Sequence, residues 1–228
     1  MEKKSLDFII KRLKEIKNRG FISSRRGYDT GIGHTLEQLL GLKENNLSIP
    51  DWGTFEVKGQ RIETGSYITI LTKKPDKIKN AKILERYGYP RPKNGKMVIH
   101  QTVFLNKLNR QGFVLKDNIK KRTIDLYKKN TLLGSYKKSD LRSKFLEKIG
   151  DGIILVFAES KKYKGIEKFR YAEAYLLKDF VFKRYLNNIY YDIRIGRYPD
   201  GRPHDHGSAF RVKKSDLKKI FKTYRKIL

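Results

Sequence analysis

The stretch Ile49-Pro50-Asp51-Trp52-Gly53-Thr54-Phe55-Glu56-Val57-Lys58 decides how the rest of the chain is interpreted. Pro50 and Gly53 bracket a turn, because both residues favour the backbone conformations that turns require. Residues 54–58 then alternate between polar and apolar side chains, which is typical of a half-buried strand. The sequence therefore predicts a turn that leads directly into a strand of the central sheet.

Three polar side chains of this stretch can meet at one place. Side chains two apart on a strand share a face, so Glu56 and Lys58 point one way while Val57 points into the core. Asp51, on the turn, can bring a second carboxylate to the same place. Carboxylates hold a hard cation that polarises a phosphate and generates hydroxide, and an amine stabilises the attacking water or the developing charge. The pattern thus suits metal-assisted hydrolysis of a phosphodiester.

The same tripeptide also has an ordinary interpretation. The chain contains 24 acidic and 53 basic residues, so a Glu-x-Lys pattern on a strand is more often a solvated face than a catalytic site. The tripeptide alone does not decide between these interpretations, and the surrounding sequence must.

Composition limits the class of protein. The chain has 228 residues, enough for one domain of two lobes with a core that can support an enzyme site. Its net charge of +29 usually indicates a polyanionic partner, although a lysine-rich proteome would also produce it. The absence of cysteine excludes disulfides and thiolate metal ligands. Neither a signal peptide nor an apolar run of about eighteen residues occurs, so a soluble cytoplasmic protein is expected.

Two helices are predicted before the strand. Apolar residues at helical spacing predict the first helix over residues 6–16, and Gly20 is expected to end it. The same spacing predicts the second helix over residues 34–42. Glu37 lies on the flank of the second helix's apolar face, where an unpartnered carboxylate is unfavourable to bury, so it is either functional or an ordinary surface glutamate. The basic, glycine-rich loop 23–33 either binds a phosphate through its backbone or forms a tight turn, and it lacks the ending of a P-loop.

The remaining elements alternate between strands and helices. Strand 66–72 is expected to pair as a hairpin with the strand of Glu56, and Lys73 just beyond it either contacts a phosphate or is solvated. The apolar run 152–160 has the length of a central strand, and apolar spacing over 217–228 predicts an amphipathic C-terminal helix that packs on the core. The other predicted elements are strands at 97–104, 113–117 and 123–127, helices at 76–87 and 139–149, and a strand passing into a helix over 171–185.

A family resemblance links these segments. Gly31-Ile32-Gly33-His34-Thr35-Leu36-Glu37-Gln38-Leu39-Leu40-Gly41, then Glu44-Asn45-Asn46, Pro50-Asp51 and Glu56-Val57-Lys58, resembles the MvaI/BcnI restriction endonucleases, which are relatives of the mismatch-repair nicking enzyme MutH. The resemblance implies an α/β fold of the restriction-endonuclease-like PD-(D/E)xK class, with a central mixed sheet flanked by helices and two lobes around a DNA cleft. It implies that the catalytic residues are Glu37, Asp51, Glu56 and Lys58, with Asp51 and Glu56 binding Mg²⁺.

A second stretch, residues 191–211, resembles the same family. Strand alternation puts Asp192 and Arg194 on one face, and Arg211 follows beyond a loop. Reading G·C pairs needs forked donors for guanine O6 and N7 and an acceptor for cytosine N4. These three residues supply that chemistry, so contacts with DNA bases are expected from them.

Three histidines lie in segments that resemble the family. By the same resemblance His204 and His206 would reach the central base pair or a neighbouring guanine. His100, within the predicted strand 97–104, either reads a base edge or is a hydrogen-bonded structural residue. The pair His204 and His206 could instead bind zinc, but no cysteine is present to act as a third ligand.

The resemblance spans about residues 31–211 and implies a function. The chain is expected to form a single nuclease domain over 1–228, with a catalytic lobe over about 1–110 and a sheet-completing DNA-recognition lobe over about 111–228. The implied activity is that of a type II restriction endonuclease that needs Mg²⁺ and cuts double-stranded DNA at a short, near-palindromic CC-(one base pair)-GG site, with A·T or T·A at its centre. A monomer that cuts by successive nicks is implied, with a cognate DNA methyltransferase as its functional partner.

Two other functions remain open from the sequence. A MutH-like repair enzyme would share the catalytic residues but nick one strand. A non-catalytic basic DNA-binding protein would share the charge, but it would not need Asp51, Glu56 and Lys58 together.

Overall fold

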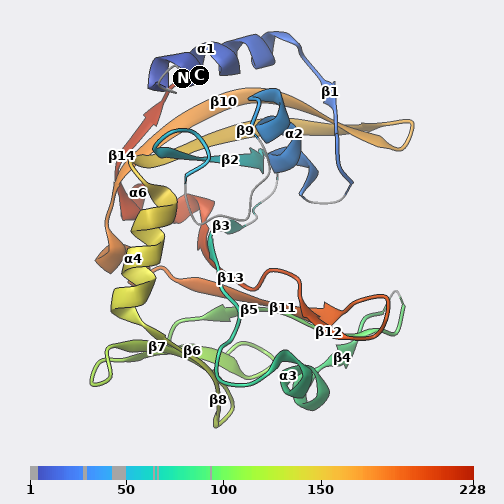
Figure 1. Cartoon of the computed structure of the whole chain (residues 1–228), viewed down its shortest axis with the longest axis vertical. Coiled ribbons are helices and arrows are strands. Elements are labelled where there is room, and N and C mark those ends of the chain that lie inside the picture. The colour runs from blue at the N-terminus through green and yellow to red at the C-terminus, as the bar shows by residue number, and fades with distance from the viewer. Residues whose placement is uncertain (1–4, 28–29, 43–49, 64, 66, 93) are drawn as a thin grey trace. The chain divides into compact units, whose positions relative to one another are not determined.

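The structure is a computed structural model that describes residues 5–27, 30–42, 50–63, 65, 67–92 and 94–228 (Figure 1). The chain divides into two compact units, each assembled from separate segments. Unit 1 contains Met1–Ser66, Leu146–Val181 and Lys214–Leu228. Unit 2 contains Tyr67–Phe145 and Phe182–Lys213. The lobes predicted from the sequence, by contrast, follow one another along the chain and meet near residue 110.

A mixed sheet forms the centre of unit 1. Its strands are β1 (Ile22–Ser23), β2 (Phe55–Arg61), β9 (Gly152–Tyr163), β10 (Ile166–Phe180) and β14 (Phe221–Lys226). The order is β1-β10-β9-β2, and β14 also pairs with β10. β2 runs parallel to β9, whereas the other pairs are antiparallel. The predicted central position of the apolar run is confirmed, because β9 lies between β10 and β2.

Two helices cover one face of this sheet. They are α1 (Leu6–Asn18) and α2 (Gly31–Leu39). α1 begins after Ser5, whose side chain accepts a hydrogen bond from a first-turn backbone N–H and so satisfies a donor that the helix leaves free. Apolar residues of both helices form one core with Val57 of β2 and Ile154 of β9. The α/β fold with a mixed sheet and flanking helices is therefore confirmed.

Unit 2 contains two antiparallel sheets. The larger has the order β3-β13-β11-β5-β4, and β12 also pairs with β11. Its strands are β3 (Tyr67–Thr72), β4 (Tyr89–Pro90), β5 (Met97–Phe104), β11 (Tyr190–Arg197), β12 (Pro203–Asp205) and β13 (Ala209–Lys213). The smaller is the meander of β6 (Phe113–Asn118), β7 (Thr123–Lys128) and β8 (Thr131–Lys137). The strands predicted at 97–104, 113–117 and 123–127 are thus confirmed as β5, β6 and β7.

Three further helices connect these strands. They are α3 (Asn80–Tyr87), α4 (Lys138–Ile149) and α5 (Phe182–Leu186). α4 agrees with the predicted helix at 139–149 and contains the boundary between the units, which falls after Phe145. The prediction of a strand passing into a helix over 171–185 is confirmed, since β10 ends just before α5 begins. The helix predicted at 76–87 begins only at Asn80.

The predicted hairpin between β2 and β3 is wrong. β3 pairs with β13 of unit 2, Ile68 opposite Val212, while β2 pairs with β9, Lys58 opposite Leu155. The apolar run of β9 is buried on both faces, and a strand of that kind is stable only between two neighbouring strands. It therefore takes the place beside β2 that the sequence analysis gave to β3.

The predicted C-terminal helix over 217–228 is also wrong. A 3₁₀ turn (Lys214–Asp216) leads into α6 (Leu217–Ile220), and the chain then continues as β14. The apolar spacing fits a helix, but Phe221, Thr223 and Tyr224 are residues that favour strands. The unpaired edge of β10 supplies hydrogen bonds to them, with Tyr224 opposite Leu177, and this tertiary pairing overrides the helical pattern.

Candidate functional site

Asp51, Glu56 and Lys58 come together in unit 1, as the sequence predicts. Oδ2 of Asp51 accepts a hydrogen bond from the backbone N–H of Val57 at 3.2 Å, which fixes the carboxylate of the turn against the start of β2. The ammonium group of Lys58 donates a hydrogen bond to Oε1 of Glu56. The turn and the alternation of the strand therefore create one cluster of two carboxylates and an amine.

Lys148, at the C-terminal end of α4, is a member of this cluster that the sequence analysis missed. Its Nζ lies 3.0 Å from Oε2 of Glu56 and 3.8 Å from Oδ1 of Asp51. The end of α4 is fixed beside the turn by Gly150, which has a φ of +59° and approaches Thr54 so closely that a Cβ would collide with its carbonyl oxygen. The sequence signal for this contact was the glycine pair that separates α4 from β9.

Glu56 is more deeply buried than is usual for a carboxylate, with only 1% of its surface exposed. Burial is the main cause that raises the pKa of Glu56, and the nearby charge of Asp51 raises it further. The positive charges of Lys58 and Lys148 act in the opposite direction. Oε2 of Glu56 accepts no hydrogen bond, because the contact with Lys148 is an ion pair without hydrogen-bond geometry. Glu56 thus offers a buried oxygen that lies next to the ammonium group of Lys148.

The donor set at this cluster fits a hard divalent cation. Asp51 and Glu56 present carboxylate oxygens, which are the ligands that Mg²⁺ and similar ions prefer. Within the part of the chain that the structure describes, no group of three or more His, Cys, Asp or Glu residues could enclose a metal. A pair of carboxylates suffices for Mg²⁺, because this ion usually keeps waters and shares its remaining positions with substrate phosphates.

The fourth predicted catalytic residue is Glu37. It belongs to α2, and α2 packs on the face of β2 that carries Val57 and Gly59, opposite to the face of Glu56 and Lys58. The packing is close, since a Cβ at Gly59 would lie 3.2 Å from the carbonyl oxygen of Ile32. The described contacts bring together three of the four predicted catalytic residues, and the role of Glu37 stays a prediction.

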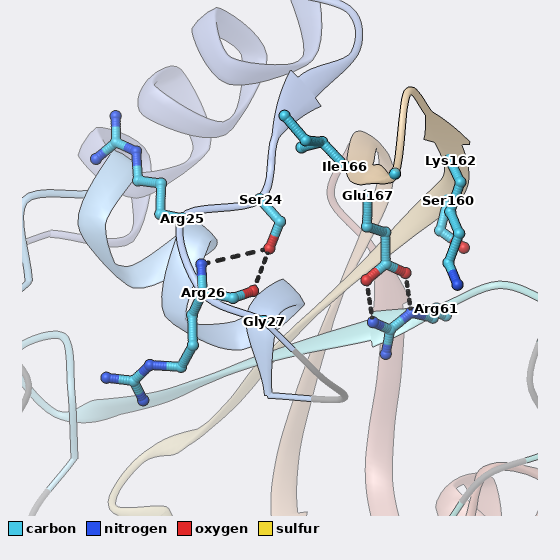
Figure 2. Close-up of a pocket in the computed structure, with 10 residues that line it drawn as sticks. Ser24, Arg25, Arg26, Gly27, Arg61, Ser160, Lys162, Ile166 and Glu167 are labelled. Carbon is cyan, nitrogen blue, oxygen red and sulfur yellow. Dashed lines mark hydrogen bonds and ion pairs between the residues drawn. The ribbon is translucent and has the colours of Figure 1, made fainter.

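A basic pocket of about 790 Å³ also lies in unit 1, on the α2 side of the sheet (Figure 2). Arg61 and Glu167 form its central pair, with Nε 2.9 Å from Oε1 and Nη2 2.8 Å from Oε2. Figure 2 shows the side chains of Arg25 and Arg26 extending away from that pair. At Gly31 a Cβ would collide with Arg26, which favours the tight-turn interpretation of the glycine-rich loop over phosphate binding. Tyr28, Asp29 and the segment 43–49 lie outside the described residues.

A second cluster forms in unit 2 around Asp192, which is 1% exposed. Thr102 donates a hydrogen bond to Oδ1 at 2.7 Å, and Arg194 Nη2 donates one to Oδ2 at 2.7 Å. Arg211 Nη1 lies 3.2 Å from the same Oδ2. The Nε atoms of Arg194 and Arg211 are buried without a hydrogen-bond partner. The structure therefore brings together Asp192, Arg194 and Arg211, and adds Thr102, which the sequence analysis did not assign.

His100 lies beside this cluster, opposite Arg194 in the pairing of β5 with β11. Arg91 Nη2 lies 3.3 Å from its Nδ1. A guanidinium can only donate, so Nδ1 accepts and the proton of the neutral ring is on Nε2, which is buried without a partner. The pKa of His100 is lowered to about 4, mainly by burial and then by the nearby charges of Arg194, Arg91 and His206. The negative charge of Asp192 acts in the opposite direction. His100 is thus neutral and carries an unpaired donor.

His204 and His206 form a ring stack at β12. The rings of Tyr198 and His204 stack at 3.9 Å, and His206 meets His204 edge-on at 4.7 Å. Gly196 leaves the space for His206, because a Cβ there would lie 2.8 Å from its Nε2. Burial lowers the pKa of His206, and His204 adds to the shift. The described residues contain no third ligand that would make these two histidines a zinc site.

Lys73 lies in the same unit, next to the segment that bears these histidines. Its backbone N–H donates to the carbonyl oxygen of Ser208 at 2.8 Å, and its Nζ lies 5.5 Å from the ring centre of Tyr136. The cation therefore rests over an aromatic ring, and a contact with phosphate remains a prediction.

An acidic pair flanked by lysines on a mixed α/β sheet is an arrangement suited to metal-dependent phosphodiester hydrolysis. The chain belongs to the MvaI/BcnI restriction endonuclease family, whose model matches residues 10–221, and this membership implies a site-specific nuclease. Restriction endonucleases of this kind generally use a divalent metal ion.

Solved structures of MvaI are similar to this chain. The complex of MvaI with its cognate DNA substrate has a TM-score of 0.85 and 26% sequence identity, covering 98% of each chain. MvaI in the absence of DNA has a TM-score of 0.54 and 27% identity, covering 100% of this chain and 98% of that one. A comparison with curated proteins gave no match. No helix in the described ranges is long and apolar enough to cross a membrane.

Proposed function

We propose that this protein is a type II restriction endonuclease that hydrolyses DNA phosphodiester bonds with Mg²⁺ held by Asp51 and Glu56. The observation that carries this proposal is the buried Glu56, which contacts the ammonium groups of Lys58 and Lys148 and lies beside Asp51 at the edge strand β2. The order Pro50-Asp51…Glu56-Val57-Lys58 is that of the PD-(D/E)xK nucleases. Similarity to a DNA complex of MvaI supports DNA as the substrate.

The residues of the cluster divide the work of hydrolysis. A bound Mg²⁺ would act as a Lewis acid on the phosphate and lower the pKa of water. Asp51 and Glu56 supply its protein ligands, and the hydrogen bond from Val57 holds Asp51 in place. Lys58, held by Glu56, donates to the attacking water and stabilises the negative charge that grows on the phosphate oxygens. Lys148 balances the charge of the two carboxylates before the cation binds.

Base reading is proposed for the cluster around Asp192. Asp192 holds Arg194 and Arg211 with their guanidinium groups ordered, and ordered forks match guanine O6 and N7. His100 offers a donor at Nε2, which must turn outward to reach a base because the atom is buried. His204, His206 and Lys73 are proposed as further DNA contacts. The proposed site is of the CC-(one base pair)-GG type with A·T or T·A at its centre.

The roles of the two units and the oligomeric state are also proposed. Unit 1 would act as the catalytic lobe and unit 2 as the recognition lobe within one nuclease domain. The enzyme would work as a monomer that cuts by successive nicks, with a methyltransferase protecting the host DNA. Sedimentation equilibrium checks this proposal, since a mass near twice 26.9 kDa would contradict a monomer.

One incubation with unmethylated plasmid DNA and Mg²⁺ tests the function. Discrete linear fragments support a restriction endonuclease. Nicked circles alone would indicate a MutH-like nicking enzyme, and intact DNA a non-catalytic binding protein. The Asp51→Ala variant is the matched control, because it should bind the same DNA in Ca²⁺ without cutting it in Mg²⁺.

A further inference from the structure

The hairpin of β9 and β10 extends the unit 1 sheet. Its turn consists of Lys164 and Gly165, whose φ values are 49° and 78°. Positive φ at both turn residues is typical of the type I′ turn, which matches the twist of the strands it joins. Figure 1 shows this hairpin extending beyond β1. Residues 161–166 at its tip are all exposed.

The strand register decides which tip residues share the face of the candidate catalytic residues. Lys58 of β2 is paired with Leu155 of β9, so both side chains lie on one face. Every second residue of β9 keeps that face, which leads to Lys161 and Tyr163. Lys168 of β10 is opposite Lys161 and shares the face. The catalytic face of the sheet therefore continues outward as a row of basic and aromatic side chains.

The cations of this row lie over aromatic rings. Nζ of Lys161 lies 3.8 Å from the ring centre of Phe21, and Nζ of Lys168 lies 5.0 Å from that of Tyr163. Tyr163 is 56% exposed. Such contacts order long side chains while leaving their charge available to an anion. The row is thus prepared to bind a polyanion.

Basic side chains lie on both faces of the tip. On the catalytic face, the carboxylate of Glu159 is neutralised by Arg170, whose Nη2 lies 2.6 Å from both oxygens, so Lys161 and Lys168 dominate. On the opposite face Lys162 stands beside Glu167 in the register. Glu167 is already paired with Arg61, so Lys162 also carries charge that is not neutralised. The catalytic face is therefore distinguished by the placement of Lys161 and Lys168 over aromatic rings, and not by a larger charge.

We propose that Lys161, Tyr163 and Lys168 bind the phosphate backbone of duplex DNA outside the recognition sequence, an inference that rests on the proposed function. Positions 155 and 163 are eight residues apart, which is about 26 Å at 3.3 Å per residue. At 3.4 Å per base pair this distance corresponds to roughly eight base pairs from the catalytic residues. A recognition site of about five base pairs does not extend so far, so the hairpin contacts flanking DNA.

Binding of full-length protein to two duplexes tests this contact. Both carry the same CC-(one base pair)-GG site at their centre, one of about 10 and the other of about 30 base pairs, so that only the longer reaches the tip. Ca²⁺ replaces Mg²⁺, and fluorescence anisotropy gives the affinity at several salt concentrations. The double variant Lys161→Gln/Lys168→Gln removes both charges and keeps the stems that cover the rings. Lys162→Gln, on the opposite face, is the matched control.

On the longer duplex, the slope of log K against log salt should become shallower in the double variant by about 0.9 for each lost phosphate contact. On the shorter duplex its slope should equal that of the wild type, and the control should match the wild type on both. An unchanged slope on the longer duplex, or an equal loss in Lys162→Gln, overturns the inference. Wild-type protein that fails to cut the longer duplex in Mg²⁺ overturns the proposed function instead, which separates the two failures.

Discussion

Lys58 is held by the buried Glu56 on an edge strand, and its own side chain is partly exposed, so its chemistry can be tested by truncating it. Replacing Lys58 by Ala removes the donor proposed to orient water and to stabilise the phosphate. The rate of cleavage should fall by at least about 10²–10³-fold, while DNA binding in Ca²⁺ persists. Single-turnover kinetics measure the loss, and cleavage near the wild-type rate would show that the catalytic assignment is wrong.

The residues of the cluster should also act as a unit. If so, Asp51→Ala, Lys58→Ala and the double variant lose nearly the same amount of activity. Lys162→Ala, on the hairpin face away from Glu56, is a suitable control and should cut at the wild-type rate on a short duplex.

Lys148 occupies the position of a cation between the two proposed metal ligands. Its Nζ lies 3.0 Å from Glu56 and 3.8 Å from Asp51. Lys148→Met should lower the melting temperature in EDTA, because two carboxylates then face each other without this charge. It should also enlarge the rise in melting temperature that Mg²⁺ produces, since the competing ammonium group is gone.

Differential scanning calorimetry with and without Mg²⁺ measures both effects. Lys144→Met, one turn earlier on the same helix, is the control and should behave as the wild type. A rise with Mg²⁺ no larger than that of the wild type would contradict the proposed position of the metal.

The sequence predicted the local part of this site and missed the distant part. Asp51, Glu56 and Lys58 lie within eight residues, so the turn and the strand alternation were enough to bring them together. Lys148 lies ninety residues beyond Lys58 and enters through the packing of Gly150 against Thr54, which no local pattern encodes. In the same way Asp192 and Arg194 followed from alternation, whereas Thr102 required the pairing of β5 with β11.

His100 makes stability depend on pH. Its pKa is about 4 in the folded protein, against 6.5 for an ordinary histidine. Between these values the unfolded chain binds a proton that the folded chain does not, so the free energy of unfolding falls as the pH drops from about 6.5 to 4. His206, shifted in the same direction, adds to the fall.

Urea unfolding between pH 7 and pH 4 measures this dependence. His100→Gln should flatten the curve below pH 6.5 and leave it unchanged in shape above. A variant with the wild-type slope throughout would mean that the neutral state of His100 is not maintained by its surroundings.

At the scale of elements, local signals identified most strands but not always their partners. The apolar run of β9 indicated a central strand, yet its parallel pairing with β2 required a connection that the sequence could not trace. At the C-terminus, Phe221 and Tyr224 fit a helix by spacing and a strand by residue type. The free edge of β10 decided between them, and an edge of that kind exists only after the sheet has formed.

The packing of α2 on β2 depends on Gly59. A Cβ there would lie 3.2 Å from the carbonyl oxygen of Ile32 and 3.3 Å from Cα of Gly33, and backbone atoms cannot turn aside as side chains do. Gly59→Ala should therefore lower the free energy of unfolding by about 1–3 kcal/mol. Chemical denaturation measures the loss. Gly65→Ala is the control, because nothing lies within 4 Å of a Cβ at that position, and equal stabilities of the two variants would contradict the close approach.

At the scale of the whole molecule, the first of the two insertions of unit 2 into unit 1 follows from one strand pair. β2 and β9 are parallel, and parallel neighbours need a long crossover connection. The segment Tyr67–Phe145 of unit 2 lies within that connection, between Arg61 and Gly152. A division of the chain into consecutive halves could not anticipate this, because it depends on which strand pairs with β2.

The net charge of +29 gives the last prediction, which concerns the chain as a whole. Many carboxylates are already paired, as Glu56, Glu167 and Asp192 are, so the surplus belongs to basic side chains available to an anion. If roughly 6–10 of them neutralise phosphates, DNA affinity should fall about 10³–10⁵-fold between 50 and 200 mM salt, because each contact releases counterions from the duplex. Anisotropy titrations in Ca²⁺ measure the slope. A slope near zero would mean that the charge reflects a lysine-rich composition and contributes nothing to DNA binding, whatever the outcome for the catalytic residues.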